Sequence, residues 1–374
     1  AAELVDIRRD FHRHPEVAGE EKRTQAKVLE WMERLGLPAH ALVETGVVGL
    51  LDSGKLGPCV LLRADMDALP VQDEKQVEYR SQTAGNMHAC GHDAHMTMLI
   101  GAASSLQENP PTRGSVKLAF QPAEERGRGA QAMLEAGVLE APKVDAAFAL
   151  HVWSPLPAGQ AVAQAGAIMA SVDAFALRVE GRSTHAARPE EGCDPIPVAA
   201  SIISAAQTLI SRRVPPYERA VLSFTSLQAG SAFNVIPAAV DMKGTLRTLK
   251  PEFREMLRDA LAHQARHLAA GAEASVDLQW FEELPVLIND EHISGLAAAA
   301  AGELQVVAAE PLLVGEDFAL LAEKVPAAML LLGSGPADSA RVIPHHHPRF
   351  DIDESVLPKG ARWLADCARA YLLG

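Results

Sequence analysis

The chain has 374 residues, of which 48% are hydrophobic and 22% are charged, and its formal net charge at pH 7 is -14. This length can form a large core, and we expect it to be divided over more than one domain. The acidic balance argues against a nucleic-acid partner, which binds a basic face, and no apolar run reaches the length of a membrane-spanning helix.

The first part of the chain has the pattern of an α/β domain. Apolar side chains recur with helical spacing over residues 3–13 and 20–35. Short uninterrupted apolar runs follow, which are typical of buried and mainly parallel strands. These runs are Val47–Leu51, Cys59–Leu62, Val116–Phe120 and Ala146–Leu150. Helical segments such as Met96–Leu106 lie between them, which predicts a mainly parallel sheet with helices on both faces.

The pattern changes near Gly166. Strand-like and helix-like segments then follow in the order β-α-β-β-α-β, which is the ferredoxin-like order. They are 172–179, 195–211, 220–227, 240–248, 252–270 and 274–280. We interpret 166–280 as an inserted α+β domain, and 1–165 together with 281–374 as one α/β domain, in which Ala327–Leu332 is a further buried strand.

The densest cluster of reactive side chains is the segment Met87–His95, which contains one cysteine, three histidines and one aspartate. Polar side chains are costly to bury without partners, and a metal ion is the partner that thiols, imidazoles and carboxylates share. Three more segments carry ligand-type residues: Glu124–Glu125, His151 and the Pro-flanked His345–His347. Together they predict a metal site.

In open α/β sheets, ligands bind beyond the carboxyl ends of the strands. Asp65 and Asp67, the Glu124–Glu125 pair and His151 each follow a predicted strand, so we expect them to converge. Cys90 lies at the start of a predicted helix, which favours a thiolate. We predict a dinuclear hydrolase centre in which Cys90 suits the bridging position and Glu124 the general base. His92, Glu125, His151 and one of the late histidines suit the terminal positions.

Several motifs resemble those of the aminoacylase/carboxypeptidase family of dinuclear metallohydrolases. Within that family the chain is most similar to the branch of hippurate hydrolase, N-acyl-amino-acid amidohydrolases and indole-acetyl-amino-acid hydrolases. The motifs are Arg63–Pro70, Met87–His95, Gln121–Glu125, Leu150–Trp153, Gly181–Pro189, Asn234–Pro237, Gly244–Thr248, Gly315–Phe318 and His346–Glu354. The resemblance covers nearly the whole chain.

The resemblance implies a role for each metal-site residue. Cys90 matches the thiolate that bridges both metals, and His92 and His151 match the terminal ligands of one of them. Glu125 and His346 match ligands of the other metal. His345 and His347 remain rivals of His346, which only its spacing to Pro348 favours.

Two further carboxylates follow from the same resemblance. Glu124 matches the general base, and Asp67 matches a carboxylate that orients a ligand. Asp65 stands where the wider family has a metal-binding histidine, so we do not expect it to bind a metal.

The inserted domain resembles the lid or dimerisation domain of that family, which implies a homodimer or higher homo-oligomer. His185 matches a histidine that stabilises the developing oxyanion, either in its own chain or across a dimer. Asn234 and Arg247 match positions that hold the substrate carboxylate. Gly315 departs from the family pattern, which usually has a serine there.

We therefore expect a cytoplasmic amidohydrolase that uses two divalent ions (Mn, Zn, Co or Ni) to cleave N-acyl amino acids, such as hippurate-like or N-acetyl conjugates. The alternatives are a metallo-dipeptidase or carboxypeptidase of the same family, a metal-free thiol hydrolase with Cys90 as the nucleophile, and a non-catalytic metal-binding homologue. The four widely spaced cysteines indicate a reducing compartment, and the charged N-terminal segment is not typical of a signal peptide. A processed secreted form is the alternative.

Overall fold

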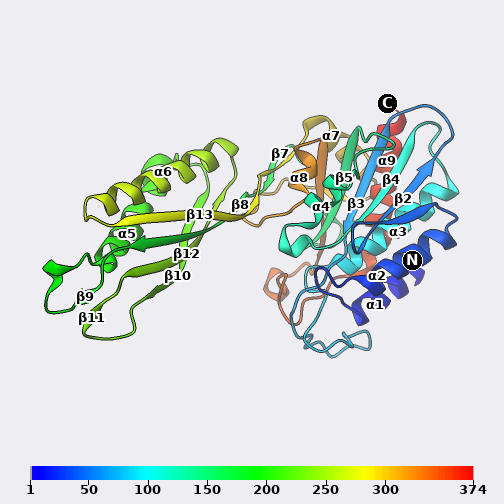
Figure 1. Ribbon diagram of the computed structural model, residues 1–374. Coiled ribbons are helices and arrows are strands. Elements are labelled where there is room, and N and C mark those ends of the chain that lie inside the picture. Colours follow the sequence, from blue (N-terminus) through cyan, green and yellow to red (C-terminus); the bar gives the residue numbers. More distant parts are fainter. Residues whose placement is uncertain (1, 374) are drawn as a thin grey trace. The chain divides into compact units, whose positions relative to one another are not determined.

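The computed structural model describes residues 2–373, except for the side chain of Glu282. The chain divides into two compact units, which Figure 1 shows coloured along the sequence. Unit 1 comprises Ala1–Ile168, Ile288–Glu310 and Asp317–Gly374, and unit 2 comprises Met169–Leu287 and Pro311–Glu316. Unit 2 thus differs at both ends from the inserted segment 166–280 expected from the sequence, and it also takes up a short segment from later in the chain.

Unit 1 is built on an eight-stranded sheet with the order β1-β2-β4-β3-β5-β16-β6-β15. Its strands are β1 (Ala39–Leu42), β2 (Gly46–Asp52), β3 (Cys59–Asp65), β4 (Ser115–Gln121), β5 (Ala146–Pro157), β6 (Gln160–Val162), β15 (Gln305–Val306) and β16 (Ala327–Gly335). The four central strands, β4, β3, β5 and β16, are parallel. The expected strand over Val47–Leu51 is present as β2, but it pairs antiparallel with both neighbours, as edge strands of such sheets often do.

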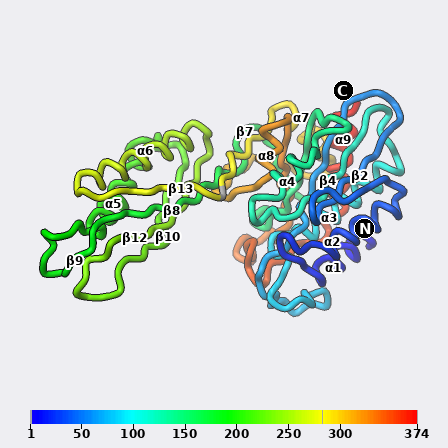
Figure 2. The backbone as a smooth tube through the Cα atoms, in the orientation of Figure 1, coloured from blue at the N-terminus to red at the C-terminus, as the bar shows by residue number. Residues whose placement is uncertain are grey.

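One face of this sheet carries the main hydrophobic core. The helices on this side are α1 (Ala2–Arg13), α2 (Lys22–Arg34), α3 (His92–Glu108), α7 (Glu291–Ala299) and α9 (Leu357–Leu373). Helix α3 is buried on nearly all sides because it packs against α1, α9 and β3. Figure 2 shows the two ends of the chain, α1 in dark blue and α9 in red, in the same unit.

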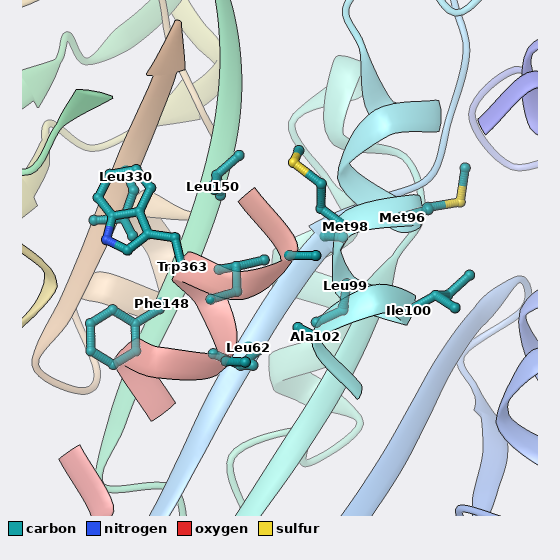
Figure 3. Packing of buried hydrophobic residues seen from close by; sticks show 14 of the residues in the cluster. Leu62, Met96, Met98, Leu99, Ile100, Ala102, Phe148, Leu150, Leu330 and Trp363 are labelled. Carbon is teal, nitrogen blue, oxygen red and sulfur yellow. The ribbon is translucent and has the colours of Figure 1, made fainter. Parts of the chain in front are cut away.

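The side chains of this core come from strands and helices alike. Figure 3 shows Leu62 of β3, Phe148 and Leu150 of β5, Leu330 of β16, Leu99 and Ala102 of α3, and Trp363 of α9. The indole N–H of Trp363 donates a hydrogen bond to the carbonyl of Ala297 at 2.8 Å, so this large ring is buried without an unpaired donor.

The opposite face of the sheet carries α4 (Gly129–Glu135) and α8 (Ala319–Ala322). Side chains alternate between the faces of a strand, so Arg63 of β3 and Lys117 of β4 point away from the main core. Lys117 Nζ donates hydrogen bonds to three carbonyls in the segment after α4, and Arg63 donates to Asp317 just before α8. The sheet therefore has helices on both faces, as the sequence predicts.

Unit 2 contains a four-stranded antiparallel sheet with the order β10-β12-β8-β13. Its elements are β8 (Val172–Glu180), α5 (Pro195–Arg213), β10 (Ala220–Ala229), β12 (Ala239–Thr248), α6 (Pro251–Ala270) and β13 (Ser275–Leu284). Phe175, Leu177 and Val179 alternate along β8 and pack with α5 and α6 on one face. This order confirms the predicted ferredoxin-like fold.

Two small ribbons complete the fold. In unit 2, β9 (Thr184–His185) pairs with β11 (Val235–Ile236). Elsewhere β7 (Gly166–Met169) pairs with β14 (Leu287–Asn289). None of the helices in the described part of the chain has the length and apolar character needed to cross a lipid bilayer.

Candidate metal centre

The predicted ligand segments of unit 1 lie where the central strands end. Strand β3 ends at Asp65, and β4 ends at Gln121 before a single 3₁₀ turn over Glu124–Arg126. His151 differs from the expectation, because β5 continues past it to Pro157 and His151 lies within the strand. The side chain of His151 still reaches the site, and its Nε2 lies 3.5 Å from Cys90 Sγ.

Gly91 connects the two ligands of the Met87–His95 motif. It has a φ of 97°, a left-handed conformation, and a Cβ at this position would lie 2.4 Å from Cγ2 of Val152 on β5. Only glycine fits both conditions. The start of α3 can therefore approach β5 closely, which brings Cys90 and His92 next to His151.

Two three-residue groups of possible metal ligands share Cys90. One consists of Cys90, His92 and His151, and the other of Cys90, Glu125 and His346, and within each group the ligand atoms lie within 4.8 Å of one another. Glu125 Oε1 lies 3.4 Å from His346 Nε2. All five residues expected to bind metal thus lie together, with the thiol common to both groups.

The hydrogen bonding of these residues fits metal binding. His92 Nε2 and Glu125 Oε1 are buried, yet neither has a hydrogen-bond partner among the described residues. His92 Nδ1 donates instead to the backbone carbonyl of Asp67 at 2.8 Å, and His151 Nδ1 donates to the carbonyl of Val152 at 2.6 Å. Both rings are therefore oriented with Nε2 towards the other ligands, as is typical of metal-binding histidines.

The electrostatics around Cys90 contradict the expectation that a helix N-terminus stabilises its thiolate. Helix α3 begins only at His92. Burial and the nearby carboxylates of Glu125, Glu124 and Asp65 raise the pKa of the Cys90 thiol well above its usual value. Without a metal ion the thiol is therefore neutral, whereas bound divalent cations would reverse this balance.

His92 is charged in the same surroundings. Burial lowers its pKa, but Asp65, Asp67 and Glu125 outweigh burial and raise the pKa of His92 to about 10. The metal-free centre therefore holds protons on both Cys90 and His92 at neutral pH.

The three late histidines have different surroundings. His346 has a left-handed φ of 65°, and its backbone N–H donates to the carbonyl of Ala89 at 2.8 Å, which turns the side chain towards Glu125. His345 Nε2 accepts from the backbone N–H of Ser154 at 3.2 Å, and its Nδ1 lies 3.3 Å from the carbonyl of Cys90. His347 Nδ1 accepts a hydrogen bond from the backbone N–H of Arg349. This arrangement favours His346 as the ligand.

Asp67 fixes the two glutamates that follow β4. Its Oδ1 accepts a hydrogen bond from the backbone N–H of Glu124, and its Oδ2 accepts one from that of Glu125, both at 3.1 Å. Glu124, Glu125 and His92 form a further group with ligand atoms within 4.8 Å of one another. A general base at Glu124 would thus lie beside the ligands.

Three residues that support the centre have no assigned role in the sequence analysis: Arg63, His95 and Asp317. Arg63 donates to Asp65 Oδ2 at 2.8 Å and to Asp317 at 2.8 Å, and His95 Nδ1 contacts Asp65 Oδ1 at 2.6 Å. Both oxygens of Asp65 are thus engaged by the protein, in keeping with its expected non-ligand role. The signal for His95 is its position one helical turn after His92 on α3.

The three predicted substrate-binding residues belong to unit 2. His185 lies on the β9–β11 ribbon and Asn234 directly precedes β11. Both are exposed, and the Ala186 N–H donates to the carbonyl of Asn234 at 3.0 Å. His185 Nδ1 accepts from the N–H of Ala187 at 3.1 Å, so the neutral ring carries its proton on Nε2. Arg247 lies apart from this ribbon in sequence, on β12 of the four-stranded sheet.

Gly315, where the family usually has a serine, is explained by its neighbour in unit 2. A Cβ at this position would lie 2.0 Å from Cγ2 of Val172. The side chain of Val172 occupies the space that a serine side chain would need.

Comparison with known proteins finds relatives over nearly the whole chain. The family model described as peptidase family M20/M25/M40 matches residues 61–370. An N-acetylcysteine deacetylase of Bacillus subtilis is 38% identical, covering 98% of this chain and 96% of that protein. Thermostable carboxypeptidase 2 of Saccharolobus solfataricus is 35% identical, covering 96% and 92%. A solved Bacillus subtilis structure, described as a dinuclear metal-binding peptidase of family M20, has a TM-score of 0.88 at 36% identity and covers 100% of this chain and 98% of that one.

Proposed function

Because this chain belongs to peptidase family M20/M25/M40 and is a metal-dependent hydrolase with two divalent ions, we propose that it cleaves the amide bond of N-acyl amino acids. The observation that carries the proposal is the pair of ligand groups that share Cys90, with Glu124 fixed beside them by Asp67. The relative named as an N-acetylcysteine deacetylase supports an N-acyl amino acid as the substrate.

We assign the two ions to the groups that share Cys90: His92 and His151 would hold one ion, Glu125 and His346 would hold the other, and Cys90 would serve both. When bound, such ions polarise a carbonyl and lower the pKa of a water molecule. The mixed set of thiolate, imidazole and carboxylate suits Mn, Zn, Co or Ni.

The remaining residues move protons and orient the substrate. Glu124 accepts the proton of the attacking water and then passes a proton to the leaving amine. Asp67 positions Glu124 and, through its backbone carbonyl, the ring of His92. His185 presents Nε2–H as a donor for the developing oxyanion, and Asn234 and Arg247 hold the substrate carboxylate.

We further propose that unit 2 mediates a homodimer and that the protein works in a reducing, cytoplasmic compartment. Phe233 is 100% exposed beside Asn234, and Val235 of the same ribbon is 45% exposed, an arrangement suited to contact with a second chain. All four cysteines are unpaired, which supports the proposed compartment.

A carboxypeptidase or dipeptidase of the same family is the second candidate, which the relative named thermostable carboxypeptidase 2 favours. The metal-free thiol mechanism is disfavoured, because burial and the carboxylates around Cys90 raise the pKa of the thiol that would have to act as nucleophile.

Hydrolysis of a matched panel tests the proposal. N-acetyl, N-benzoyl and N-indoleacetyl derivatives of one amino acid are compared with dipeptides that end in the same residue, each with Mn, Zn, Co or Ni added to stripped protein. We expect metal-dependent release of the amino acid from at least one N-acyl derivative, at a higher kcat/KM than from any dipeptide. Faster cleavage of dipeptides would favour the second candidate.

A further inference from the structure

A second cluster of buried charges lies beside the metal centre in unit 1. Arg8 of α1 is fully buried, and it donates to Asp93 Oδ2 at 2.8 Å, to Asp351 Oδ1 at 2.8 Å and to Glu354 Oε1 at 3.1 Å. Arg8 and Asp93 are fully buried, while Asp351 and Glu354 keep 26% and 17% of their side chains exposed. Burying an ion pair such as Arg8–Asp93 is expensive, and apolar residues of similar volume are often as stable or more so. Stability alone therefore does not account for this arrangement.

His12 lies one turn further along α1 and is also fully buried. Its Nδ1 contacts the same Asp93 oxygen at 2.7 Å, and its Nε2 lies 2.7 Å from Lys75 Nζ. Lys75 Nζ in turn donates to the backbone carbonyl of Phe350 at 2.9 Å. Asp93, His12, Lys75 and the Phe350 carbonyl thus form one continuous chain of polar contacts.

Two series of polar contacts connect the same two segments that carry proposed metal ligands. Asp93 directly follows His92 in the first turn of α3, while Phe350 and Asp351 lie in the loop that carries His346. One route runs from Asp93 through Arg8 to Asp351, and the other runs through His12 and Lys75 to Phe350. A third link connects the Lys75 segment to the same loop, because the N–H of Glu74 donates to the carbonyl of Pro348 at 2.9 Å.

We propose that Arg8 and His12 are positioning residues of the dinuclear centre, which set the separation between the segment of Cys90 and His92 and the loop of His346. This inference rests on the ligand set proposed above. Neither side chain touches the proposed ligands; each acts through Asp93 on one side and through Asp351 or Lys75 on the other. Helix α1 would thus fix the distance between His92, a proposed ligand of one ion, and His346, a proposed ligand of the other.

The test compares metal binding by Arg8→Lys, His12→Gln and a control, Lys117→Met. Lysine keeps the charge of Arg8 but lacks the planar fork that spans Asp93 and Asp351. Glutamine at position 12 keeps an acceptor for Lys75 but loses the ring nitrogen at Asp93. Lys117 is also buried, at 3% exposure, and its Nζ donates to three carbonyls outside the ligand segments.

Affinity for each ion is measured by competition with a chromophoric chelator, alongside the visible spectrum of the cobalt(II) form and the Tm of the stripped protein. We expect Arg8→Lys and His12→Gln to weaken binding of at least one ion by about ten- to a hundredfold and to alter the cobalt spectrum, as loss of ligand-orienting groups usually does. Lys117→Met should lower Tm but leave metal affinity within about twofold of wild type.

Wild-type affinity and an unchanged cobalt spectrum in folded Arg8→Lys and His12→Gln would overturn the proposal. An equal loss of affinity in Lys117→Met at a matched fall in Tm would also overturn it, because general destabilisation would then explain the loss. Cys90→Ser, measured in the same assay, separates this failure from a failure of the ligand set: if it retains both ions tightly, the ligand assignment itself is wrong.

Discussion

The carboxylate of Asp67 accepts a hydrogen bond from the backbone N–H of Glu124 at 3.1 Å, while its second oxygen does the same for the next residue, Glu125. One buried side chain thereby fixes two adjacent glutamates whose side chains are proposed to do different work, proton transfer and metal binding. Asp67 holds both backbones alike, and the side chains distinguish the two residues, because Glu125 Oε1 lies 3.4 Å from His346 Nε2 and groups with Cys90 and His346.

Replacement of Glu124 by glutamine should separate catalysis from metal binding. The amide has nearly the same shape but cannot accept a proton, so kcat should fall by about a hundred- to ten-thousandfold while metal content stays near that of wild type. Metal analysis and kinetics are performed on the same preparation. A metal-loaded variant with near-normal kcat would show that Glu124 is not the base.

Replacement of Cys90 tests the bridge. Cys90→Ser should lose metal from both positions, because a neutral hydroxyl replaces the ligand common to both groups. Cys90→Asp should bind more metal than Cys90→Ser, because an anionic ligand is restored. Cys193→Ser serves as the control, since Cys193 is buried in unit 2 and its thiol donates to the carbonyl of Ala272. Tight binding of two ions by Cys90→Ser would rule out the bridging role.

Single alanine variants at His345, His346 and His347 should differ in metal affinity and in Tm. His346→Ala should lower metal affinity most, because its Nε2 faces Glu125. His345→Ala should mainly lower Tm, because this ring stacks on Trp153 with a centroid separation of 4.8 Å and is engaged by the backbone on both nitrogens. Metal affinity and Tm are measured for all three, and a larger loss of affinity at position 345 or 347 would contradict the assignment.

Metal binding should release protons, and the affinity for metal should increase as the pH rises. In the metal-free centre the pKa of His92 is about 10 and that of Cys90 lies well above its usual value, so at neutral pH both ligands are protonated. Protons therefore compete with metal, and affinity falls as the pH falls. Calorimetry in buffers of different ionisation enthalpy counts the released protons, and we expect about two per chain. A pH-independent affinity would contradict this electrostatic picture.

His185 can be tested in mixtures of subunits. His185→Ala should lower kcat while metal content and oligomeric mass remain unchanged, because the residue belongs to unit 2 and the proposed ligands belong to unit 1. If His185 acts on the partner chain, mixing His185→Ala with Glu124→Gln subunits should restore about one intact site per mixed dimer. A mixture no more active than its two parents would assign His185 to its own chain.

The sequence predicts the fold and the proposed ligands largely because both depend on local patterns. The parallel strands are visible as apolar runs, and Cys90, Glu124 and His151 stand out because polar residues adjoin those runs. Periodicity cannot reveal the β9–β11 ribbon, since strands of two residues have no period, nor the antiparallel direction of β2, which depends on its partners. The Arg8–Asp93–Asp351 contacts join residues that are distant in the chain, so no local pattern marks them.

The expectation of a stabilised Cys90 thiolate failed for a different reason. The sequence already indicates that Glu124, Glu125 and Asp65 gather near Cys90, but the expectation considered only the following helix and not the effect of burial and these carboxylates on the thiol. Burial and three carboxylates raise the pKa of the thiol, and the helix begins only two residues after it, at His92. The same crowding of carboxylates is what makes the site suitable for two cations.

The most direct test of a dinuclear mechanism centred on Cys90 is to measure metal content and N-acyl amino acid hydrolysis together while metal is stripped and restored. We expect hydrolysis to disappear with chelation, to return in proportion as two ions per chain are reloaded, and not to return once the stripped protein has been alkylated at Cys90. Stripped protein that still hydrolyses the substrate, and that loses activity only on alkylation, would contradict a dinuclear mechanism and establish a thiol nucleophile instead.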